Sequence, residues 1–328
     1  RLAGRGHEVT VLCGEPGIDN PREEWINNVH VVRWPVLAPG DAYHIPRMRS
    51  RLKKMLLDSA KDYDVIHFHS AHSVLAMYSL SVLKDFKVRK VLTPHYHGTG
   101  HTLFRRLLWK GWRKIIKSAL RYVDVVHTVS NVEAQYVARD FCVKPLTIEH
   151  GVEEWLLNVS WSPSNYVMYS GRIEKYKNIH RLANIVRILN EMGLNLKLKI
   201  FGDGSFKHKL LGFLNKLKVE YELNPPQPYK EYINHLSRAT LFGLLSEKEA
   251  FGQAVNEANA LGVPVVVVEP WGLNFKGRSR TLISRLDKSD ENITHEIVEF
   301  LKMCGNQPKS NVPAWEQVVD IYIKVLYK

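Results

Sequence analysis

The sequence predicts an α/β protein built from two doubly wound domains that follow one another along the chain and face each other across a ligand-binding cleft. Three observations lead to this prediction. The chain has 328 residues, which is long for a single hydrophobic core. Short apolar segments rich in β-branched residues alternate with longer helical segments, as in parallel sheets flanked by helices. A polar segment at 151–165, interpreted as a linker, interrupts this alternation, which then begins again.

The first domain is predicted to span residues 1–153. Its strands are expected at 8–12, 29–34, 65–68, 90–93, 124–128 and 145–148, and its helices at 46–61, 71–84, 102–121 and 131–140. The first residues have the pattern of a helix end and a Gly turn, so the opening strand and glycine-rich loop of such a domain are missing. Either that element precedes the sequence or the protein has lost it.

The second domain is predicted to span residues 154–328. Its strands are expected at 166–170, 195–201, 218–222, 239–245 and 263–268, and its helices at 177–192, 206–217, 228–237 and 253–261. Ligands of doubly wound sheets bind outside the carboxyl ends of the strands, so the residues that follow the strands are the ones to search for chemistry.

Composition limits the class of protein. Hydrophobic residues make up 45% of the chain and charged residues 24%, which is typical of globular proteins and excludes disorder and fibres. The longest apolar runs are far shorter than the roughly 20 residues of a membrane span. Cys13, Cys142 and Cys304 lie far apart without a Cys-x-x-Cys pair, which argues against a disulfide framework or a zinc knuckle. With no secretory signal visible, we expect a cytoplasmic protein.

The net charge of +13 is concentrated in part on one predicted helix. Between Arg105 and Arg121 the chain has seven bases and no acid, with apolar residues in between. Such a helix can lie on an anionic membrane surface. The candidates for this contact are Arg105, Arg106, Trp109, Lys110, Trp112, Arg113, Lys114 and Lys117. The alternative is a surface helix that packs its apolar stripe on the core and leaves its bases in water.

Two segments of the second domain have the composition of a phosphate site. Arg172 and Lys177 follow a predicted strand in Ser-Gly-Arg-Ile-Glu-Lys-Tyr-Lys-Asn, where a guanidinium fork and an ammonium can clamp phosphates. Gly202 and Gly204 follow the next strand and let the backbone approach a ligand. Surface charge and an ordinary turn are the alternatives for these two motifs.

Glu249 and Glu257 stand on either side of the Phe251-Gly252 joint, just before an Ala-rich helix. Backbone amides and the helix dipole favour an anion at a helix N-terminus, so a sugar joined to a diphosphate would suit this place. A solvated helix start is the alternative. Glu257 lies among apolar neighbours, however, and a half-buried carboxylate usually has a partner.

Histidines gather where strands of the first domain end. His67 and His69 close one predicted strand, and His95 and His97 follow another. Histidine can act as a base, a hydrogen-bond donor or a metal ligand. Contact with a polar ligand, a structural role and metal binding by the two His-x-His pairs all stay open at this point.

In combination these motifs resemble the retaining glycosyltransferases of family 4, which have the two-domain GT-B fold. The second half carries Gly171-Arg172 with Lys177, Gly202-x-Gly204, Glu249-x-Phe251-Gly252 to Glu257-Ala258, and Gly262-Val-Pro-Val-Val. The first half carries Asp64-Val-Ile-His-Phe-His, Thr93-Pro-His-Tyr-His and Asp124-Val-Val-His-Thr-Val-Ser. The resemblance covers nearly the whole chain. It also implies that a last helix, at 313–327, crosses back onto the first domain.

The resemblance implies roles for the matching residues. Arg172 and Lys177 would bind the diphosphate, Glu257 the ribose hydroxyls, and Glu249 hydroxyls of the donor sugar. His95 would contact the donor sugar near the reacting carbon, which makes the catalytic candidates His95, Arg172, Lys177 and Glu249. Further donor-binding candidates are Gly171, Gly202, Gly204, Phe251, Gly252 and Glu257, and the first-domain or acceptor candidates are His69 and His97.

The implied activity is transfer of a sugar from a nucleoside diphosphate such as UDP or GDP to an acceptor, with the anomeric configuration retained. No cofactor or metal is required, because arginine, lysine and helix N-termini neutralise the leaving diphosphate. The basic helix favours a lipid-linked or glycan acceptor at the cytoplasmic face of a membrane, and nucleic acid is not an expected partner.

Two departures from the family bear on this expectation: the missing glycine-rich loop, and His150-Gly151-Val152-Glu153 where many members have Asn-Gly-Val-Asp. Other functions therefore stay open. A GT-B epimerase or phosphorylase would use a similar site for different chemistry. A non-catalytic module that binds membrane or nucleic acid would have a degenerate sugar site. A metal hydrolase would use the paired histidines.

Overall fold

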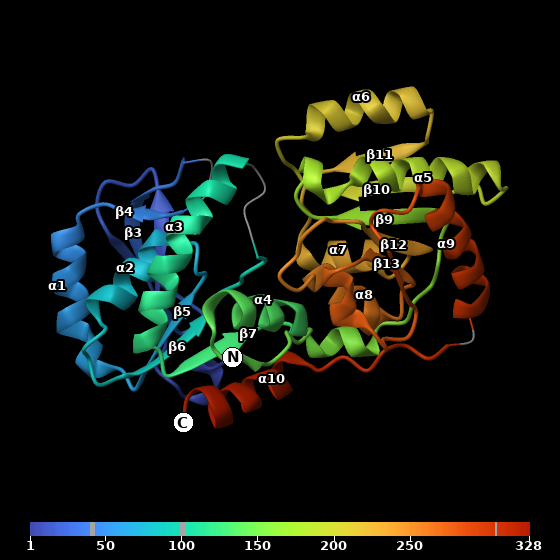
Figure 1. Cartoon of the computed structure of the whole chain (residues 1–328). Helices are drawn as coiled ribbons and strands as arrows, with labels where there is room; N and C mark the ends of the chain where they lie inside the picture. The colour runs from blue at the N-terminus through green and yellow to red at the C-terminus, as the bar shows by residue number, and fades with distance from the viewer. Residues whose placement is uncertain (40–42, 99–102, 306) are drawn as a thin grey trace. The chain divides into compact units, whose positions relative to one another are not determined.

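The computed structural model describes residues 1–39, 43–98, 103–305 and 307–328 (Figure 1). Its contacts divide the chain into two units. Unit 1 comprises Arg1–Glu149 together with Glu316–Lys328, and unit 2 comprises His150–Trp315. The predicted division after residue 153 falls a few residues later than this one. Each predicted strand and helix occurs, with ends shifted by a few residues.

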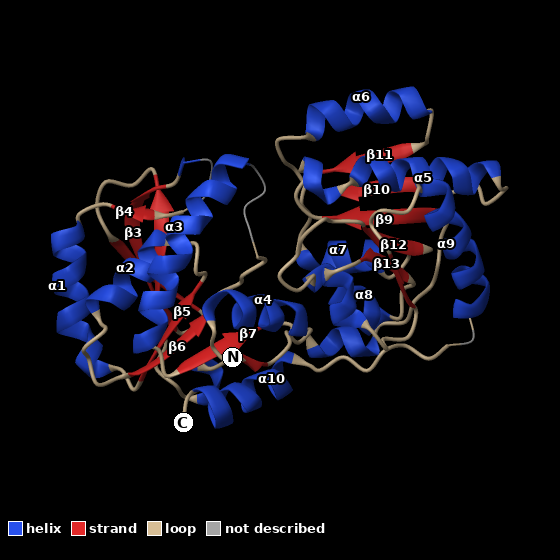
Figure 2. Cartoon of the chain, in the orientation of Figure 1, coloured by secondary structure: helices blue, strands red, loops and turns tan. Residues whose placement is uncertain are grey.

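Unit 1 contains two sheets, whose strands are red in Figure 2. In the first, β1 (Thr10–Pro16) pairs in parallel with β3 (Val29–Leu37), and β2 (Arg22–Ile26) and β4 (Ile45–Pro46) pair with β3 in antiparallel fashion. The second consists of parallel strands in the order β5 (Val65–His69), β6 (Arg89–Thr93), β7 (Val125–Thr128) and β8 (Leu146–Thr147). The sequence did not predict β2 and β4. β2 is a mostly exposed edge strand whose Arg-Glu-Glu start hides the usual strand pattern.

In the described part of unit 1, α-helices connect these strands, and one more helix follows unit 2 in the chain. They are α1 (Arg49–Ser59), α2 (Val74–Val82), α3 (Leu103–Ala119), α4 (Asn131–Phe141) and α10 (Trp315–Ile321). Short 3-10 turns occupy Ala3–Arg5, Ala60–Asp62 and Leu120–Tyr122, and α10 continues as a wider π-helical turn over Tyr322–Leu326. Ser73 and Ser130 cap α2 and α4, each accepting a hydrogen bond from a backbone N–H three residues on.

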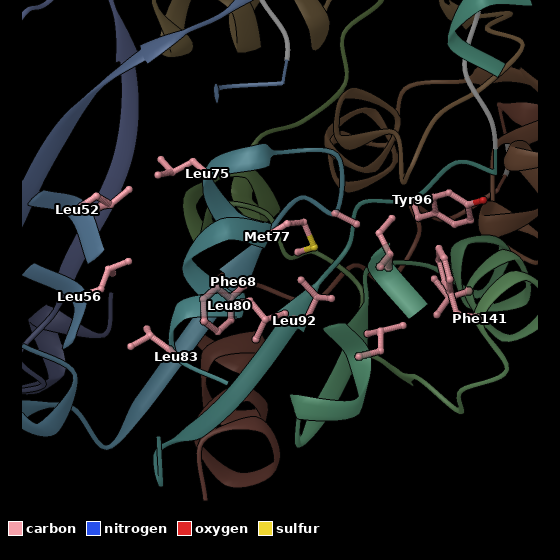
Figure 3. Close-up of a cluster of buried hydrophobic side chains, with 14 of the residues drawn as sticks. Leu52, Leu56, Phe68, Leu75, Met77, Leu80, Leu83, Leu92, Tyr96 and Phe141 are labelled. Carbon is pink, nitrogen blue, oxygen red and sulfur yellow. The ribbon is translucent and has the colours of Figure 1, made fainter. Parts of the chain in front are cut away.

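The core of unit 1 joins residues of the second sheet and of the helices (Figure 3) to Trp34 and Val36 of β3 in the first sheet. Leu52 and Leu56 come from α1, Leu75 and Leu80 from α2, and Phe68 and Leu92 from the strands; the cluster extends to Tyr96 and Phe141. The last turn of the chain adds to unit 1. Leu326 is fully buried, its carbonyl accepts a hydrogen bond from Arg89 Nε at 2.6 Å, and Arg1 forms an ion pair with Glu316 at 2.6 Å.

The described part of unit 2 contains a parallel sheet in the order β11-β10-β9-β12-β13-β14, of which Figure 1 labels β11 to β13. The strands are β9 (Tyr166–Ser170), β10 (Lys197–Phe201), β11 (Tyr221–Asn224), β12 (Leu241–Leu244), β13 (Val265–Val268) and β14 (Thr281–Ser284). The four valines of β13 are fully buried, as in a strand covered on both faces. The order of the strands along the sheet reverses between β9 and β12, and ligands of doubly wound sheets bind at such a switch point.

The helices of unit 2 alternate with the strands. They are α5 (Ile179–Glu191), α6 (Lys207–Leu217), α7 (Tyr229–Leu236), α8 (Gln253–Leu261) and α9 (Asp290–Cys304), with 3-10 turns at Glu154–Asn158, Lys175–Lys177 and Trp271–Phe275. The sequence did not predict β14 and α9. The interpretation of 151–165 as a linker was wrong, because Leu156 is fully buried and Trp161 Nε1 donates to the Ala239 carbonyl at 2.8 Å.

Candidate functional site

The strand order of unit 2 brings two of the predicted motifs together. The loop with Arg172 and Lys177 follows β9, and the loop with Glu249 follows β12, the strand next to it. Lys177 Nζ donates to Glu249 Oε1 at 2.5 Å, with side chains that are 9% and 17% exposed. A mostly buried ion pair therefore lies at the carboxyl ends of the two strands that flank the switch point.

Tyr176 lies between the two cations of this loop. Arg172 Nη2 donates to the Tyr176 hydroxyl at 2.9 Å, and Lys177 Nζ lies 5.1 Å from the centre of the Tyr176 ring. Arg172 is exposed, whereas Lys177 is buried. The site thus has one guanidinium that an anion can reach directly and one ammonium already held by a carboxylate.

The glycines of the predicted motifs permit close backbone contact between the loops after β9 and β10. A Cβ on Gly202 (φ 147°) would lie 1.9 Å from the Gly171 carbonyl oxygen, and one on Gly204 (φ 159°) would lie 2.4 Å from the Ile173 carbonyl oxygen. These positions require glycine for packing and conformation alike. The two loops consequently form a compact wall beside Arg172.

Glu257 on α8 is held by two tyrosines that the sequence analysis missed. Tyr229 donates to its Oε1 at 3.1 Å and Tyr232 to its Oε2 at 3.0 Å, both from α7. The residue is 7% exposed, and burial raises the pKa of its carboxyl above the usual range. The spacing of the tyrosines, three apart on a predicted helix, places both on one face and was the signal available in the sequence.

The Phe251-Gly252 joint before α8 packs against aromatic side chains of unit 2. The Phe251 ring is buried, 5.1 Å from the His150 ring and 5.5 Å from the Phe275 ring between centres. Gly252 (φ 101°) has no room for a Cβ, which would lie 2.8 Å from Trp271. The ring of Phe251 is therefore a packing group, and only the backbone of this joint is left to line a donor site.

The segment that differs from the family pattern is tied to α8. The His150 carbonyl accepts a hydrogen bond from Asn256 Nδ2 at 2.9 Å, and the Gly151 carbonyl accepts one from Gln253 Nε2 at 3.0 Å. Both donors lie on the same helix as Glu257. His150 thus contributes its backbone and ring to the support of α8.

The histidines of unit 1 form a hydrogen-bonded chain around Thr93. Thr93 Oγ1 lies 2.7 Å from both His67 Nε2 and His127 Nδ1, and His67 Nδ1 lies 2.9 Å from the Tyr327 hydroxyl. Burial, with the neighbouring histidines, lowers the pKa of His67 to about 2. His67 is therefore a neutral structural residue that connects the end of the chain to the sheet.

His69 and His95 lie beside this chain, with His69 Nδ1 3.4 Å from His95 Nε2. His69 is the last residue of β5 and His95 lies in the loop after β6, where its backbone is left-handed (φ 48°). His97 is half-buried two residues further on. Among the residues that the structure describes, no group of three or more histidines, cysteines or acids is placed to hold a metal ion.

One carboxylate fixes the loop that carries His95. Glu133 accepts the backbone N–H of Tyr96 at 2.6 Å and that of Val129 at 2.9 Å, so it ties together the loops after β6 and β7. Burial raises the pKa of Glu133 to about 7. Glu133 is not among the residues predicted from the sequence, although Ser130-x-x-Glu133 is the pattern of a helix start and the Ser130 hydroxyl accepts the Glu133 N–H at 3.1 Å.

The structure corrects the assignment of three residues of the basic helix α3 to a membrane surface. Trp109 is 8% exposed in the core, and Trp112 Nε1 donates to the Ala71 carbonyl at 2.7 Å. Arg113 Nε donates to the Tyr96 hydroxyl at 2.9 Å. Trp109 is buried, and Trp112 and Arg113 are half-buried and hydrogen-bonded within unit 1, because the helix packs its aromatic stripe against this unit.

The outer face of α3 keeps part of the predicted surface. Lys110, Lys114 and Lys117 are exposed, and so are Leu107, Leu108 and Ile115 at 65%, 49% and 50%. The side chains of Arg105 and Arg106 lie outside the part of the chain that the structure describes. Within the described residues, no helix is both long enough and apolar enough to span a membrane.

Two family descriptions match consecutive parts of the chain. Residues 1–154 match Glycosyltransferase Family 4, and residues 158–274 match Glycosyl transferases group 1. The capsular polysaccharide biosynthesis glycosyltransferase CapM of Staphylococcus aureus is 24% identical over 180 residues, which are 48% of this chain and 46% of CapM. The N-acetyl-alpha-D-glucosaminyl L-malate synthase of Bacillus anthracis is 23% identical over 308 residues, 83% of this chain and 74% of the synthase. The chain thus spans less than half of the first relative.

Solved structures share the fold. Sucrose-phosphate synthase of Thermosynechococcus elongatus has a TM-score of 0.71 at 18% identity, with 100% of this chain and 86% of that one covered. Anabaena HepE, in complex with UDP and glucose, has a TM-score of 0.70 at 14% identity, with 91% and 86% covered. With its two halves matching two successive glycosyltransferase descriptions, the chain belongs to the family 4 glycosyltransferases with the GT-B fold.

Proposed function

We propose that the protein moves a sugar from a nucleoside-diphosphate sugar to a hydroxyl acceptor and retains the configuration at the anomeric carbon. The observation that carries this proposal is the arrangement at the switch point of unit 2. Exposed Arg172, the Lys177–Glu249 pair and the tyrosine-held Glu257 lie on loops and helices that follow neighbouring strands. Cations, a sugar-binding acid and a ribose-binding acid are the groups that such a donor needs.

Each group has a distinct proposed role. Arg172 and Lys177 neutralise the charge that develops on the diphosphate as its bond to the anomeric carbon breaks. Glu249 accepts hydrogen bonds from hydroxyls of the sugar, and Glu257 accepts them from the ribose. The acceptor oxygen forms the new bond on the same face, and its proton passes to the departing phosphate oxygen. His95 of unit 1 is the proposed further catalytic residue.

We propose a donor with uracil as its base, because the solved relatives include complexes with UDP, HepE and TarM among them. Two fixed cations serve the diphosphate, so the proposed reaction needs no metal ion. For the acceptor, the named relatives act in capsular polysaccharide biosynthesis and in malate glycosylation, which supports a saccharide or another hydroxyl compound.

The outer face of α3 supports an acceptor at a membrane. Exposed Leu107, Leu108 and Ile115 lie beside exposed Lys110, Lys114 and Lys117, the combination that binds interfaces rich in anionic lipid. We propose that the protein acts peripherally, at the cytoplasmic face, on a lipid-linked or glycan acceptor.

The test begins with binding. Thermal denaturation is followed with UDP, GDP and ADP, and a nucleotide at about a hundred times its dissociation constant should add about 2.7 kcal/mol to the stability of the protein. The preferred nucleotide then decides which nucleotide sugars are incubated with candidate acceptors, and NMR of the product reports the configuration of the new bond. A protein that binds none of the three nucleotides would be a non-catalytic module, and a product formed without acceptor would indicate an epimerase.

A further inference from the structure

The proposed function assigns different ligands to two residues that form a hydrogen-bonded ion pair with each other. Lys177 is proposed to bind the diphosphate and Glu249 the sugar, yet Lys177 Nζ donates to Glu249 Oε1 at 2.5 Å. The side chains are 9% and 17% exposed, so water screens this pair weakly. Arg172 differs from Lys177 in being exposed and in donating to the neutral hydroxyl of Tyr176.

A carboxylate and a diphosphate compete for a buried ammonium. A lysine removed from water is stable only when a negative group compensates it, and Glu249 is the group that does so in this structure. A diphosphate that reaches Arg172 first brings a second negative group to the same ammonium. While the carboxylate is engaged by Lys177, it is a weaker acceptor for sugar hydroxyls, because its charge is shared.

We propose that Lys177 is exchanged between Glu249 in the protein without donor and the diphosphate in the donor complex. The exchange couples the two ends of the donor: once the diphosphate takes Lys177, the Glu249 carboxylate is released to accept hydroxyls of the sugar. By reciprocity, a bound sugar strengthens the hold on the diphosphate. This inference rests on the proposed function and adds an order of events within its donor site.

The decisive measurement is the affinity of the protein for inorganic pyrophosphate and for UDP, by titration calorimetry. Glu249→Gln removes the competing charge and keeps the shape, so both probes should bind about tenfold more tightly, or about 1.4 kcal/mol. Glu247→Gln is the matched control, since it makes the same charge change two residues away at an exposed position, where salt screens the effect. The exchange is overturned if the affinity of Glu249→Gln for the two probes is unchanged or lower than that of the natural protein. It is also overturned if Glu249→Gln and Glu247→Gln gain affinity equally.

A second comparison, in protein that lacks the Lys177 ammonium, distinguishes the exchange from an effect of Glu249→Gln on folding. In Lys177→Gln the ammonium is gone, so adding Glu249→Gln should no longer tighten pyrophosphate binding beyond the Glu247→Gln control. Thermal denaturation of each variant reports folding, and pyrophosphate should raise the melting temperature of Glu249→Gln more than that of the natural protein. Tightening that persists without Lys177 would contradict the exchange. If the natural protein binds neither UDP, GDP nor ADP, the proposed donor site itself fails; if it binds one of them and the variants behave alike, only the exchange fails.

Discussion

Glu257 owes its orientation to side chains that lie 25 and 28 residues away in sequence. Each of its oxygens accepts one tyrosine hydroxyl, from Tyr229 and Tyr232, and Gln253 supplies a further side-chain hydrogen bond to the carboxylate. A carboxylate held in this way presents two acceptor positions side by side. In the proposed function, the two neighbouring hydroxyls of the donor's ribose bind at these positions.

Removal of the Tyr232 hydroxyl should therefore weaken nucleotide binding through the ribose. A buried carboxylate that loses one hydrogen-bond donor is destabilised by about 1–3 kcal/mol, and Tyr232→Phe should bind UDP roughly tenfold more weakly. The affinity for 2′-deoxy-UDP should fall less, because that ligand lacks one of the hydroxyls concerned. Tyr221→Phe is the control, since its hydroxyl donates to Asn215 at the surface. If the ratio of the affinities for UDP and 2′-deoxy-UDP is the same in Tyr232→Phe as in the natural protein, this role is contradicted.

Glu133 should give the protein a characteristic dependence of stability on pH. Burial raises its pKa from 4.5 to about 7 in the folded chain, so the folded state holds the proton to higher pH than the unfolded state. The contribution of Glu133 to the free energy of unfolding is therefore largest at low pH, falls as the pH rises from 4.5 to about 7, and is constant above that range.

Glu133→Gln removes this titration. Urea denaturation at about pH 5 and about pH 8 should show a smaller fall in the free energy of unfolding than in the natural protein, by up to a few kcal/mol. The variant should also be less stable overall. A glutamine side chain has one oxygen and one NH2 group, so one of the two backbone N–H groups would face the NH2 group instead of an acceptor. Asp58→Asn, at an exposed position on α1, is the control for a lost carboxylate. An unchanged pH dependence in Glu133→Gln would contradict the assignment.

At the scale of elements, α3 has two faces with different tasks. Its inner face places Trp109 in the core and uses Arg113 to hold Tyr96, next to His95. Its outer face carries the exposed apolar and basic residues. Periodicity predicted the helix and its amphipathic character, but only packing decided which aromatic side chains are available at the surface.

The outer face of α3 should govern membrane binding. Replacement of Leu108 and Ile115 together by serine removes apolar area while leaving the inner face unchanged, so co-sedimentation with vesicles that contain anionic lipid should fall several-fold. Trp25→Ser is a matched control, because Trp25 is 73% exposed on strand β2, away from this helix in sequence. Equal binding of all three proteins, or equal binding to neutral and anionic vesicles, would contradict a membrane role for α3.

At the scale of the whole molecule, the end of the chain is part of unit 1. Tyr327 bonds to His67, Leu326 is fully buried, and the rings of Tyr322 and His127 lie 5.1 Å apart. The proposed nucleotide-binding residues Lys177, Glu249 and Glu257 all belong to unit 2. The two units should therefore respond differently when the end of the chain is removed.

A chain that ends after Ile321 should lose stability in unit 1 and keep its affinity for UDP. Burial of Leu326 and two tyrosine rings contributes several kcal/mol, so the calorimetric transition of unit 1 should move to lower temperature. UDP should still raise the transition of unit 2. Removal of Lys328 alone is the control. A parallel loss of UDP affinity in the longer truncation would show that the end of the chain also supports the nucleotide site.

The sequence by itself determined the features that depend on local pattern. Alternating apolar and helical segments predicted the two-domain α/β fold, and the comparisons confirm the family that the motifs resemble. It also placed Arg172, Lys177, Glu249 and Glu257 at the ends of strands or on the following helix. These predictions succeeded because a strand, a turn and a helix start are specified by residues close together in the chain. The charged edge strand β2 was not predicted because its pairing with β3, rather than a local apolar pattern, defines it.

Only the tertiary structure decided which of these residues touch. Lys177 and Glu249, 72 residues apart, meet because β9 and β12 are neighbours in the sheet. Tyr232 reaches Glu257, and Glu133 joins two loops, through contacts that no local pattern specifies. The physical reason is the same in each case: strand order and helix packing follow from burial of apolar surface over the whole core, and this long-range balance sets the partners of every charge in the site.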